Sequence, residues 1–481
     1  TQETKPVATL DRKLRKQEKK IAQHQAYLDK LKATYEKDCE NSVRLHSLKD
    51  KLGTTLAALK PKPKPKKTKN LREKTMKLNR RKFLATTAAV AAAVAVPSIS
   101  LAGDTIKLGS VLDTSGGFDA YGKPMNMALQ LAVEKINADG GLLGKQVEVI
   151  GYDTQSDMAL YTQYAQQLVR QDKVDVVHGG ILSASREAIR QTMRKSKTLY
   201  FYNVLYEGGV CDRNIFINGV TPAQQVEALV PYAMGKSGKK VYILAADYNY
   251  GQITAEWIKK YVAENGGETV GLDFFPLDVS DFGSTIAKIQ SVGPDLVIAP
   301  LVGAAHLSFF RQWAASGMKD KIALASTTMG VGNEHKVLSA AETDGIMVAY
   351  NYSQDIDSPA NNAFKANWEV AFGDSNSIHE IAVSNYQGVL TWAEGVRAAG
   401  SLDRDAVIAA LETGISIDGP GGKVTVDPKT HHAVLDVHLM EMENQGMRVV
   451  KTLSQRQPID TQAVCDLAAN PNDNTQYEIK F

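Results

Sequence analysis

Two serines stand where a small molecule can bind, just past the end of a strand-like run. Residues 174–177 form a short apolar run, and Ser183 and Ser185 follow it at the start of a helical pattern over residues 186–197. In an open parallel sheet, small ligands lie beyond the carboxyl ends of the strands, where the free N–H groups of helix N-termini point. Hydroxyl groups placed there can donate hydrogen bonds to a carbonyl or a carboxylate, so we predict one wall of a ligand cleft.

Aromatic side chains follow the next strand-like run, which covers residues 198–202. Tyr202 ends this run, and Tyr206 and Glu207 come shortly after it. Tyrosine rings are large and largely apolar, so a pair of them beyond a strand end favours a partly buried cleft wall over plain solvent. The alternative is that the two serines only cap the helix, which is a common role of serine at a helix start.

The elements that must position these residues alternate between strands and helices. Before the two serines, we predict strands at residues 106–112 and 145–152 and helices at residues 123–138 and 158–171. After Thr221 the same order restarts. This second series comprises helices at residues 224–236, 254–265, 284–292 and 304–316, strands at residues 241–245, 268–275, 296–299 and 322–326, and a loop at residues 247–251. Such alternation indicates an α/β fold with two doubly wound parallel-sheet lobes joined by a hinge.

Length and charge bound the class of protein. A chain of 481 residues that is 43% hydrophobic is globular and too long for a single core. The net charge of +3 hides an asymmetry: residues 1–75 hold 21 Lys and Arg against 9 Asp and Glu, whereas residues 103–481 hold 31 against 44. Proteins that neutralise phosphates need the opposite sign, so the acidic body argues against a nucleic-acid partner.

Residues 1–75 form a basic extension, and all 12 methionines lie at or beyond Met76. We expect this extension to lie upstream of the natural start. Residues 10–59 have the composition of a charged helix or weak coiled coil, and residues 60–69 form a basic linker rich in proline. The alternative is a tail that binds nucleic acid or a membrane surface.

Residues 76–102 have the pattern of an export signal. The pair Arg80 and Arg81 precedes an apolar stretch at residues 85–96, and small residues follow up to Ala102. The apolar stretch is too short to span a bilayer. The paired arginines resemble a twin-arginine signal, and the alternative is a general secretory signal. In either case we expect cleavage near Ala102 and a periplasmic mature protein.

Cysteine usage fits export. Cys39 lies in the extension, which leaves Cys211 and Cys465 in the exported body. In an oxidising compartment a disulfide between these two is the simplest prediction, and it would tie the C-terminal end of the chain to the segment after Glu207. The alternative is two buried, unpaired thiols.

The sequence holds no Gly-x-Ser-x-Gly, no His-Glu-x-x-His, no P-loop and no Cys-x-x-Cys motif. Ser183 has only His178 near it in sequence as a base, and His431 and His432 follow Asp427 in a predicted turn, where we expect surface histidines. We therefore expect a protein that is not an enzyme and that uses no cofactor and no metal.

The chain from about residue 104 to about residue 458 resembles the type I periplasmic solute-binding proteins of the branched-chain amino acid, amide and urea group. Within that group it is most similar to the binders of short-chain amides and urea. The matching segments are KINADGGLLGK at residues 135–145, NVLYEGG at 203–209, TPAQQ at 221–225, ADYNYG at 246–251, PLDVSDFGSTIAKI at 276–289, DIDSPANNAF at 355–364 and GPGGKVTVDPKTHH at 419–432.

This resemblance implies a receptor with two lobes that closes around its solute and delivers it to an ABC permease of the inner membrane. The first lobe is expected at residues 103–224, with residues 353–420 returning to it. The second is expected at residues 225–352, with residues 421–456 returning to it. Residues 457–481 are left as a C-terminal tail.

The resemblance also implies a set of site residues, because in such proteins first-lobe hydroxyls bind one end of the ligand and second-lobe tyrosines contact it from the other side. Carried onto this sequence, the set is Ser183, Ser185, Tyr206 and Glu207 from the first lobe, with Tyr248, Tyr250 and Gly303 from the second. An uncharged amide or urea offers a carbonyl acceptor and NH₂ donors, which serine hydroxyls, backbone N–H groups, tyrosine oxygens and a carboxylate can satisfy.

Other functions stay open at this stage. A branched-chain or polar amino acid would need an acid for its ammonium group, and Glu207 or Glu334 can supply one. The chain departs from the amide pattern at Asn203, where proline is usual, and at Leu205, where a more polar residue is usual. An amide-sensing regulator or an amide hydrolase is the remaining alternative, and the export signal argues against the regulator.

Overall fold

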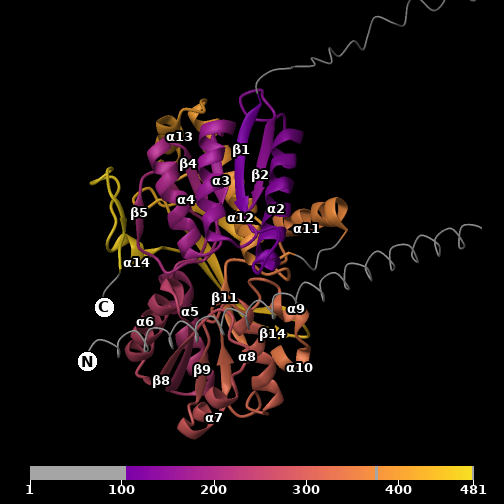
Figure 1. The fold of residues 1–481 in the computed structure, drawn as a ribbon, viewed down its shortest axis with the longest axis vertical. Helices are drawn as coiled ribbons and strands as arrows, with labels where there is room; N and C mark the ends of the chain where they lie inside the picture. The colour runs from indigo at the N-terminus through magenta and orange to yellow at the C-terminus, as the bar shows by residue number, and fades with distance from the viewer. Residues whose placement is uncertain (1–104, 374–377, 479–481) are drawn as a thin grey trace, which may run out of the picture. The chain divides into compact units, whose positions relative to one another are not determined.

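Five parallel strands form the central sheet of the first lobe (Figure 1). The computed structural model describes residues 105–373 and 378–478. The strands are β1 (Ile106–Leu112), β2 (Val147–Asp153), β3 (Val176–Gly179), β4 (Leu199–Tyr202) and β6 (Ile215–Ile217). They lie in the order β2-β1-β3-β4-β6, and every neighbouring pair is parallel. Ligand-facing loops of the first lobe therefore gather at one edge of the sheet.

Helices cover both faces of this sheet. Successive side chains of a strand point to opposite faces, so both faces carry apolar side chains that need a cover. Val176 and Phe201 pack into one hydrophobic cluster, whereas the next residue in each strand packs into another. The first face carries α2 (Asp119–Ala138), α11 (Pro359–Phe372), α12 (Glu380–Ala399) and α13 (Arg404–Leu411), and the second carries α3 (Met158–Gln167) and α4 (Ser183–Ser196).

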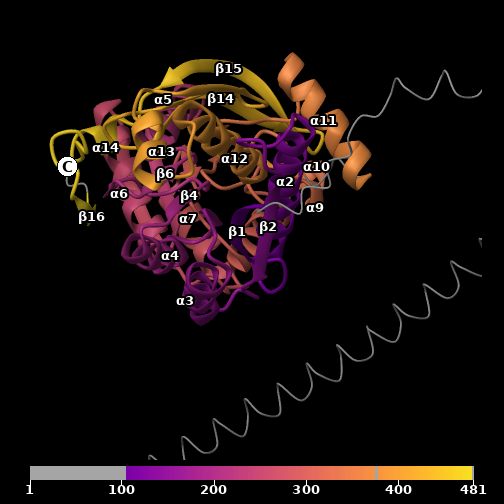
Figure 2. The same cartoon turned by 90° about the horizontal axis from the view of Figure 1, so that it is seen from above.

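The sheet of the second lobe is mixed. Its parallel part comprises β7 (Lys240–Ala246), β8 (Glu268–Phe275), β9 (Leu296–Ile298), β10 (Ala323–Ala325) and β11 (Met347–Tyr350). Its antiparallel part comprises β12 (Ser416–Gly419), β13 (Gly422–Val426), β14 (Ala433–Glu443) and β15 (Gly446–Arg456). The long β14–β15 hairpin runs along one side of the body, with α3 on the opposite side (Figure 2).

The second lobe is also covered by helices. They are α5 (Pro222–Ser237), α6 (Asn249–Glu264), α7 (Gly283–Val292), α8 (Ala304–Ala315), α9 (Glu334–Val337) and α10 (Ala340–Thr343). The chain enters this lobe between β6 and α5, returns to the first lobe between β11 and α11, and reaches the second lobe again along β14. The predicted α/β class with two lobes is confirmed. The sequence pattern missed the antiparallel strands at one edge of the second sheet, and in the first lobe it missed β6 and the helices α11, α12 and α13.

Most predicted elements are present with shifted ends. The loop predicted at residues 247–251 is wrong in its second half, because α6 already begins at Asn249 and places Tyr250 in its first turn. The strand predicted at residues 174–177 lies at residues 176–179 instead, so that His178 and Gly179 belong to the strand.

A C-terminal segment returns to the first lobe beside α4. After α14 (Ile459–Gln462), the strand β16 (Asn474–Gln476) pairs antiparallel with β5 (Val210–Asp212). A disulfide joins Cys211 in β5 to Cys465, 254 residues away. The C-terminal tail is therefore fixed to β5, the strand that follows β4 in the chain.

None of the helices within the described ranges has both the length and the apolar character needed to cross a membrane. The expectations for residues 1–75 and for the export signal at residues 76–102 fall outside the described residues.

Candidate functional site

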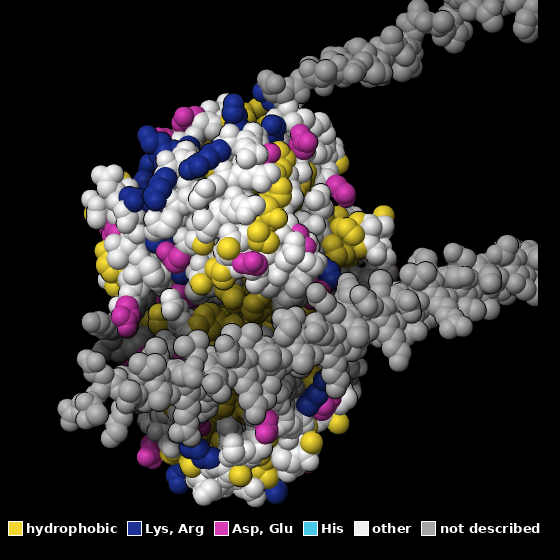
Figure 3. Space-filling model, in the orientation of Figure 1, with side chains coloured by type: hydrophobic (Ala, Val, Ile, Leu, Met, Phe, Trp, Pro, Cys, Tyr) yellow, Lys and Arg dark blue, Asp and Glu magenta, His cyan; other side chains and the backbone are white. Residues whose placement is uncertain are grey.

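A cavity lies between the two lobes, and its wall is mostly apolar and aromatic. The space inside it is about 450 Å³ when the open mouth is counted. The first lobe contributes Phe118, Tyr121, Ile181, Leu182, Ser183, Tyr202, Val204, Leu205 and Ile381, and the second contributes Tyr248, Tyr250, Val302, Thr328 and Val331. On the face shown in Figure 3, hydrophobic side chains gather where the lobes meet.

The turn between β3 and α4 brings the start of α4 to the cavity. Gly179 has a φ of 150°, and a Cβ atom there would lie 2.2 Å from the carbonyl oxygen of Val111. Only glycine allows this close approach. Leu182 is the N-cap of α4, and its side chain makes no capping hydrogen bond. Among the described residues, no N-cap side chain therefore accepts from the first N–H groups of the helix, at the place where Leu182 and Ser183 line the cavity.

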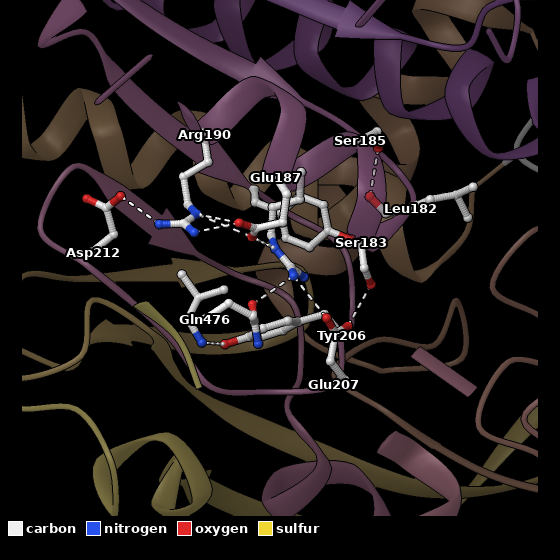
Figure 4. Close-up of polar contacts among 12 residues, drawn as sticks. Leu182, Ser183, Ser185, Glu187, Arg190, Tyr206, Glu207, Asp212 and Gln476 are labelled. Atoms are coloured by element: carbon white, nitrogen blue, oxygen red, sulfur yellow. Dashed lines mark hydrogen bonds and ion pairs between the residues drawn. The ribbon is translucent and has the colours of Figure 1, made fainter. Parts of the chain in front are cut away.

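Ser183 is linked to a buried ion pair behind the cavity wall (Figure 4). Its hydroxyl donates to Oε2 of Glu207 at 2.6 Å, and Oε1 of Glu207 accepts from Nη2 of Arg186 at 2.9 Å. Both charged side chains are fully buried. Burial alone would lower the pKa of Arg186, but the carboxylates of Glu207 and Glu187 raise that pKa well above its ordinary value. Arg186 is therefore a permanent cation one residue layer away from the cavity.

The ring faces of two tyrosines enclose the Arg186 guanidinium. Its central carbon lies 5.3 Å from the ring centre of Tyr202 and 4.7 Å from that of Tyr206. Gln476 of the tail accepts a further hydrogen bond from Arg186 at 2.9 Å. The cation–π contacts and this bond hold the cation in place within the wall.

Four predicted site residues line the cavity, and four do not. Ser183, Tyr202, Tyr248 and Tyr250 are in the wall; Ser185, Tyr206, Glu207 and Gly303 are not. Ser185 instead accepts from the Ile181 N–H and donates to the Leu182 carbonyl, which fixes the turn before α4.

The other three lie directly behind the wall. Glu207 accepts the hydrogen bond of the Ser183 hydroxyl, and Tyr206 packs on Arg186 and hydrogen-bonds His432. Gly303 is the N-cap of α8, next to the lining residue Val302. These residues support the groups that touch the cavity.

The sequence reasoning missed several lining residues. Phe118 and Tyr121 follow β1 at the start of α2, and Thr328 and Val331 follow β10. All four lie past the carboxyl end of a strand, so the rule that identified Ser183 applied to them too. Ile381 lies in the first turn of α12, and no such strand precedes it.

Most hydroxyl groups of the wall already donate to the protein. Tyr202 donates to the Ile181 carbonyl at 2.7 Å, Tyr121 donates to Glu334 at 2.8 Å, and Thr328 donates to the Leu301 carbonyl at 2.6 Å. Tyr250 shares a hydrogen bond of 2.9 Å with Thr327. The oxygens of the first three can therefore only accept hydrogen bonds from a ligand.

Glu334 connects the lobes near the cavity. Its carboxylate accepts from the Tyr121 hydroxyl of the first lobe and from the N–H groups of Gly330 and Gly332 in the second. Burial would raise the pKa of Glu334, but the nearby His306 and the hydrogen bond from Tyr121 lower that pKa to about 2. Glu334 is therefore an anion at neutral pH.

The two neighbouring histidines are not at the surface, which corrects the expectation from the sequence. His431 and His432 are both 1% exposed. The ring of His431 stacks on Phe216, and the ring of His432 stacks on Tyr206. Burial lowers the pKa of His432 to about 4. Across residues 105–373 and 378–478, no group of three or more His, Cys, Asp or Glu side chains could hold a metal ion.

The chain matches the family model described as periplasmic binding protein over residues 105–447. It therefore belongs to the periplasmic binding protein family. A relative from Brucella melitensis, described as Leu/Ile/Val-binding protein homolog 6, is 23% identical over 70% of this chain and 88% of its own length.

Solved structures share the fold. A solute-binding protein of an ABC transporter from Rhodopseudomonas palustris, in complex with p-hydroxybenzoic acid, is 25% identical with a TM-score of 0.67 and covers 74% of this chain and 98% of its own. A branched-chain amino acid transporter substrate-binding protein from Streptococcus pneumoniae, in complex with isoleucine, is 23% identical with a TM-score of 0.65 and covers 73% and 99%. The expectation of a solute-binding protein and not an enzyme is confirmed.

Proposed function

We propose that this protein is the solute-binding component of an ABC importer, and that its solute is a small molecule with an apolar body and one polar end. The observation that carries this proposal is the interlobe cavity, whose wall combines tyrosine rings and aliphatic side chains with the start of α4, which has no side-chain cap among the described residues. The apolar body lies among the rings, and the polar end lies at the first turn of α4, where free N–H groups favour a carbonyl or carboxylate oxygen.

Among the solutes predicted from the sequence, this wall favours short-chain amides and branched-chain amino acids over urea. Urea has no apolar body to place against Phe118, Tyr248 and Val331. A short-chain amide or a branched-chain amino acid has both a carbonyl oxygen for α4 and carbon atoms for the wall. The names of the Brucella relatives and the isoleucine complex support an amino acid, whereas the hydroxybenzoate complex shows that a related fold holds an aromatic ring.

We propose that the protein acts in the periplasm and hands its solute to an inner-membrane ABC permease. The family match supports this location, and the twin-arginine-like segment at residues 76–102 supports export. Binding then proceeds by closure of the two lobes on the solute, as the cavity between them suggests.

Calorimetric titration of the purified chain tests the proposal. The panel is urea, isovaleramide, L-leucine, L-isoleucine, L-glutamine and 4-hydroxybenzoate. Saturable binding of at least one compound with an apolar body, without chemical change of that compound by mass spectrometry, is the expected result. Turnover of a bound compound, or saturable binding of urea alone, would contradict the proposal.

A further inference from the structure

We propose that Glu207, held by Arg186, makes the Ser183 hydroxyl a pure hydrogen-bond acceptor toward the cavity, so that the site selects solutes with an N–H donor beside a carbonyl or carboxylate. The solute class is then a carboxamide or an α-amino acid and not a bare carboxylic acid. This inference rests on the proposed solute-binding function and assigns a specificity role to two buried residues outside the cavity wall.

The first step concerns the single proton of Ser183. The Ser183 oxygen lies 2.6 Å from Oε2 of Glu207, which is a short distance typical of a hydroxyl that donates to a carboxylate. An ionised carboxylate has no proton to give, so the Ser183 hydroxyl is the donor. Its remaining lone pairs are what Ser183 offers to the cavity that it lines.

The second step concerns the charge of Glu207. The carboxylate is 1% exposed, and a buried charge needs a partner of opposite sign. Arg186 supplies that cation at 2.9 Å and is itself 0% exposed. A guanidinium does not lose its proton in proteins, so the pair stays ionised and the direction of the Ser183 bond is fixed.

The third step concerns the groups near Ser183 in the wall. The Tyr202 hydroxyl donates to the Ile181 carbonyl, so the tyrosine oxygen can only accept a hydrogen bond from a ligand in the cavity that Tyr202 lines. Donors at this end include the N–H groups of the first turn of α4, which has no side-chain cap among the described residues. The end of the cavity thus needs a ligand group that accepts and donates at once. A carboxamide and the α-amino acid head group do both, whereas a carboxylate brings only acceptors against the Ser183 lone pairs.

The tail extends this arrangement. The Gln476 side-chain oxygen accepts from Nη2 of Arg186, and its nitrogen donates to the Gly208 carbonyl at 2.8 Å. Gln476 is fixed by the pairing of β16 with β5 next to the Cys211–Cys465 disulfide. Glu207, Arg186 and Gln476 are therefore positioning residues, and Ser183 is the group that touches the solute.

The binding test uses matched pairs of solutes that differ in the donor. Calorimetry compares isovaleramide with isovalerate, and L-leucine with 4-methylpentanoate, on the full chain. In whichever pair binds, we expect the compound with the N–H donor to bind at least about tenfold more tightly than the matched acid. A carboxylate that binds as tightly as its matched donor would overturn the inference.

The variant test removes the carboxylate to which the Ser183 hydroxyl donates its hydrogen bond. The double substitution Arg186→Met with Glu207→Leu replaces a buried ion pair by apolar side chains, a change that proteins often tolerate. We expect the preference for the donor to shrink several-fold in this variant. Ser196→Ala, at the exposed far end of α4, is the matched control and keeps the preference. An unchanged preference in the double variant would contradict the role of Glu207.

A measurement without solute separates this inference from the proposed function. Ser183→Ala should lower the melting temperature of the full chain by a few degrees, because Glu207 loses a donor. In the Arg186→Met, Glu207→Leu background the same change should have a much smaller effect. If no compound of the panel binds, the proposed function fails. The melting temperatures still test the role of Glu207, because equal shifts from Ser183→Ala in both backgrounds would overturn it.

Discussion

At the scale of single residues, the site depends on side chains of the cavity wall whose orientation is fixed by their neighbours. Tyr250 combines a buried ring in the cavity wall with a hydroxyl that is bonded to Thr327. The ring supplies apolar surface to the solute, and the bond to Thr327 fixes the orientation of that ring. Substitutions can therefore measure the contribution of the ring and that of the hydroxyl separately.

Tyr250→Ala should weaken solute binding by about tenfold or more, because a buried aromatic contact is worth roughly 1.5–3 kcal/mol. Calorimetry with the best compound of the panel measures the effect. Tyr250→Phe keeps the ring and should lose much less affinity. An affinity that is unchanged in Tyr250→Ala would show that the solute lies elsewhere.

Glu380 in the first turn of α12 makes stability depend on pH. The side chain is 0% exposed, Ser384 donates to one of its oxygens, and its other oxygen has no hydrogen-bond partner among the described residues. Burial raises the pKa of Glu380 to about 8, from 4.5 in an ordinary environment. Because the folded state binds the proton more tightly, its contribution to stability is complete below pH 4.5 and is lost as the pH rises to about 8.

Glu380→Gln should therefore raise the melting temperature by several degrees at pH 8 and by little at pH 5. Thermal unfolding at both values measures this difference. The exposed Glu369→Gln is the control and should shift neither value. Equal shifts at pH 5 and pH 8 in Glu380→Gln would show that ionisation of this carboxyl group does not limit stability.

At the scale of elements, the C-terminal tail connects the fold of the first lobe to its site. The strand β16 adds to β5 outside the main sheet, and the disulfide closes a loop of 254 residues. The residues that follow Cys465 carry Gln476 to the buried Arg186. The disulfide therefore acts on the cavity through the position of the tail.

Without reductant, the purified chain should show no free thiol at Cys211 or Cys465 by mass spectrometry after alkylation. The double substitution to serine removes a long-loop cross-link, for which the chain-entropy model gives roughly 5 kcal/mol as an upper value. We expect a clearly lower melting temperature in that variant. Two alkylated thiols in the untreated protein would exclude the disulfide.

At the scale of the whole molecule, a hydrogen bond from Tyr121 to Glu334 joins the lobes at the cavity. The lobes meet so closely there that a Cβ atom on Gly332 would lie 2.6 Å from the Tyr121 ring. This bond forms only when the lobes are together. It therefore favours the closed arrangement.

Tyr121→Phe should weaken solute binding several-fold and leave the molecule more open, because closure loses a charge-assisted hydrogen bond. Calorimetry measures the affinity, and small-angle X-ray scattering with and without solute measures the closure. Tyr164→Phe, on α3 and outside the cavity wall, is the control. Unchanged affinity and scattering in Tyr121→Phe would show that this contact does not contribute to closure.

Export of the whole molecule is testable through the signal. Arg80→Lys together with Arg81→Lys should keep the protein in the cytoplasm if the twin-arginine route carries it. Cell fractionation and immunoblotting measure the distribution, and Lys82→Arg is the control that keeps the pair. Continued export of the double variant would indicate the general secretory route.

The sequence alone determined the fold class, the order of strands and helices from residue 106 to residue 202, and the position of Ser183. These follow from local periodicity and from the rule that ligands lie beyond the carboxyl ends of parallel strands, as the strand at residues 106–112 and the serine after β3 show. Such signals are local, because each depends on residues that are neighbours in the chain.

Only the tertiary structure decided which predicted residues face the cavity and what they can do there. Glu207 and Tyr206 were predicted to touch the solute, yet they lie behind the wall, where Arg186 pairs with Glu207 and His432 hydrogen-bonds Tyr206. Burial and the direction of a hydrogen bond depend on partners that are not neighbours in the chain: Arg186 is 21 residues from Glu207, and His432 is 226 residues from Tyr206. Local patterns carry no information about such partners, and the fold alone brings them together.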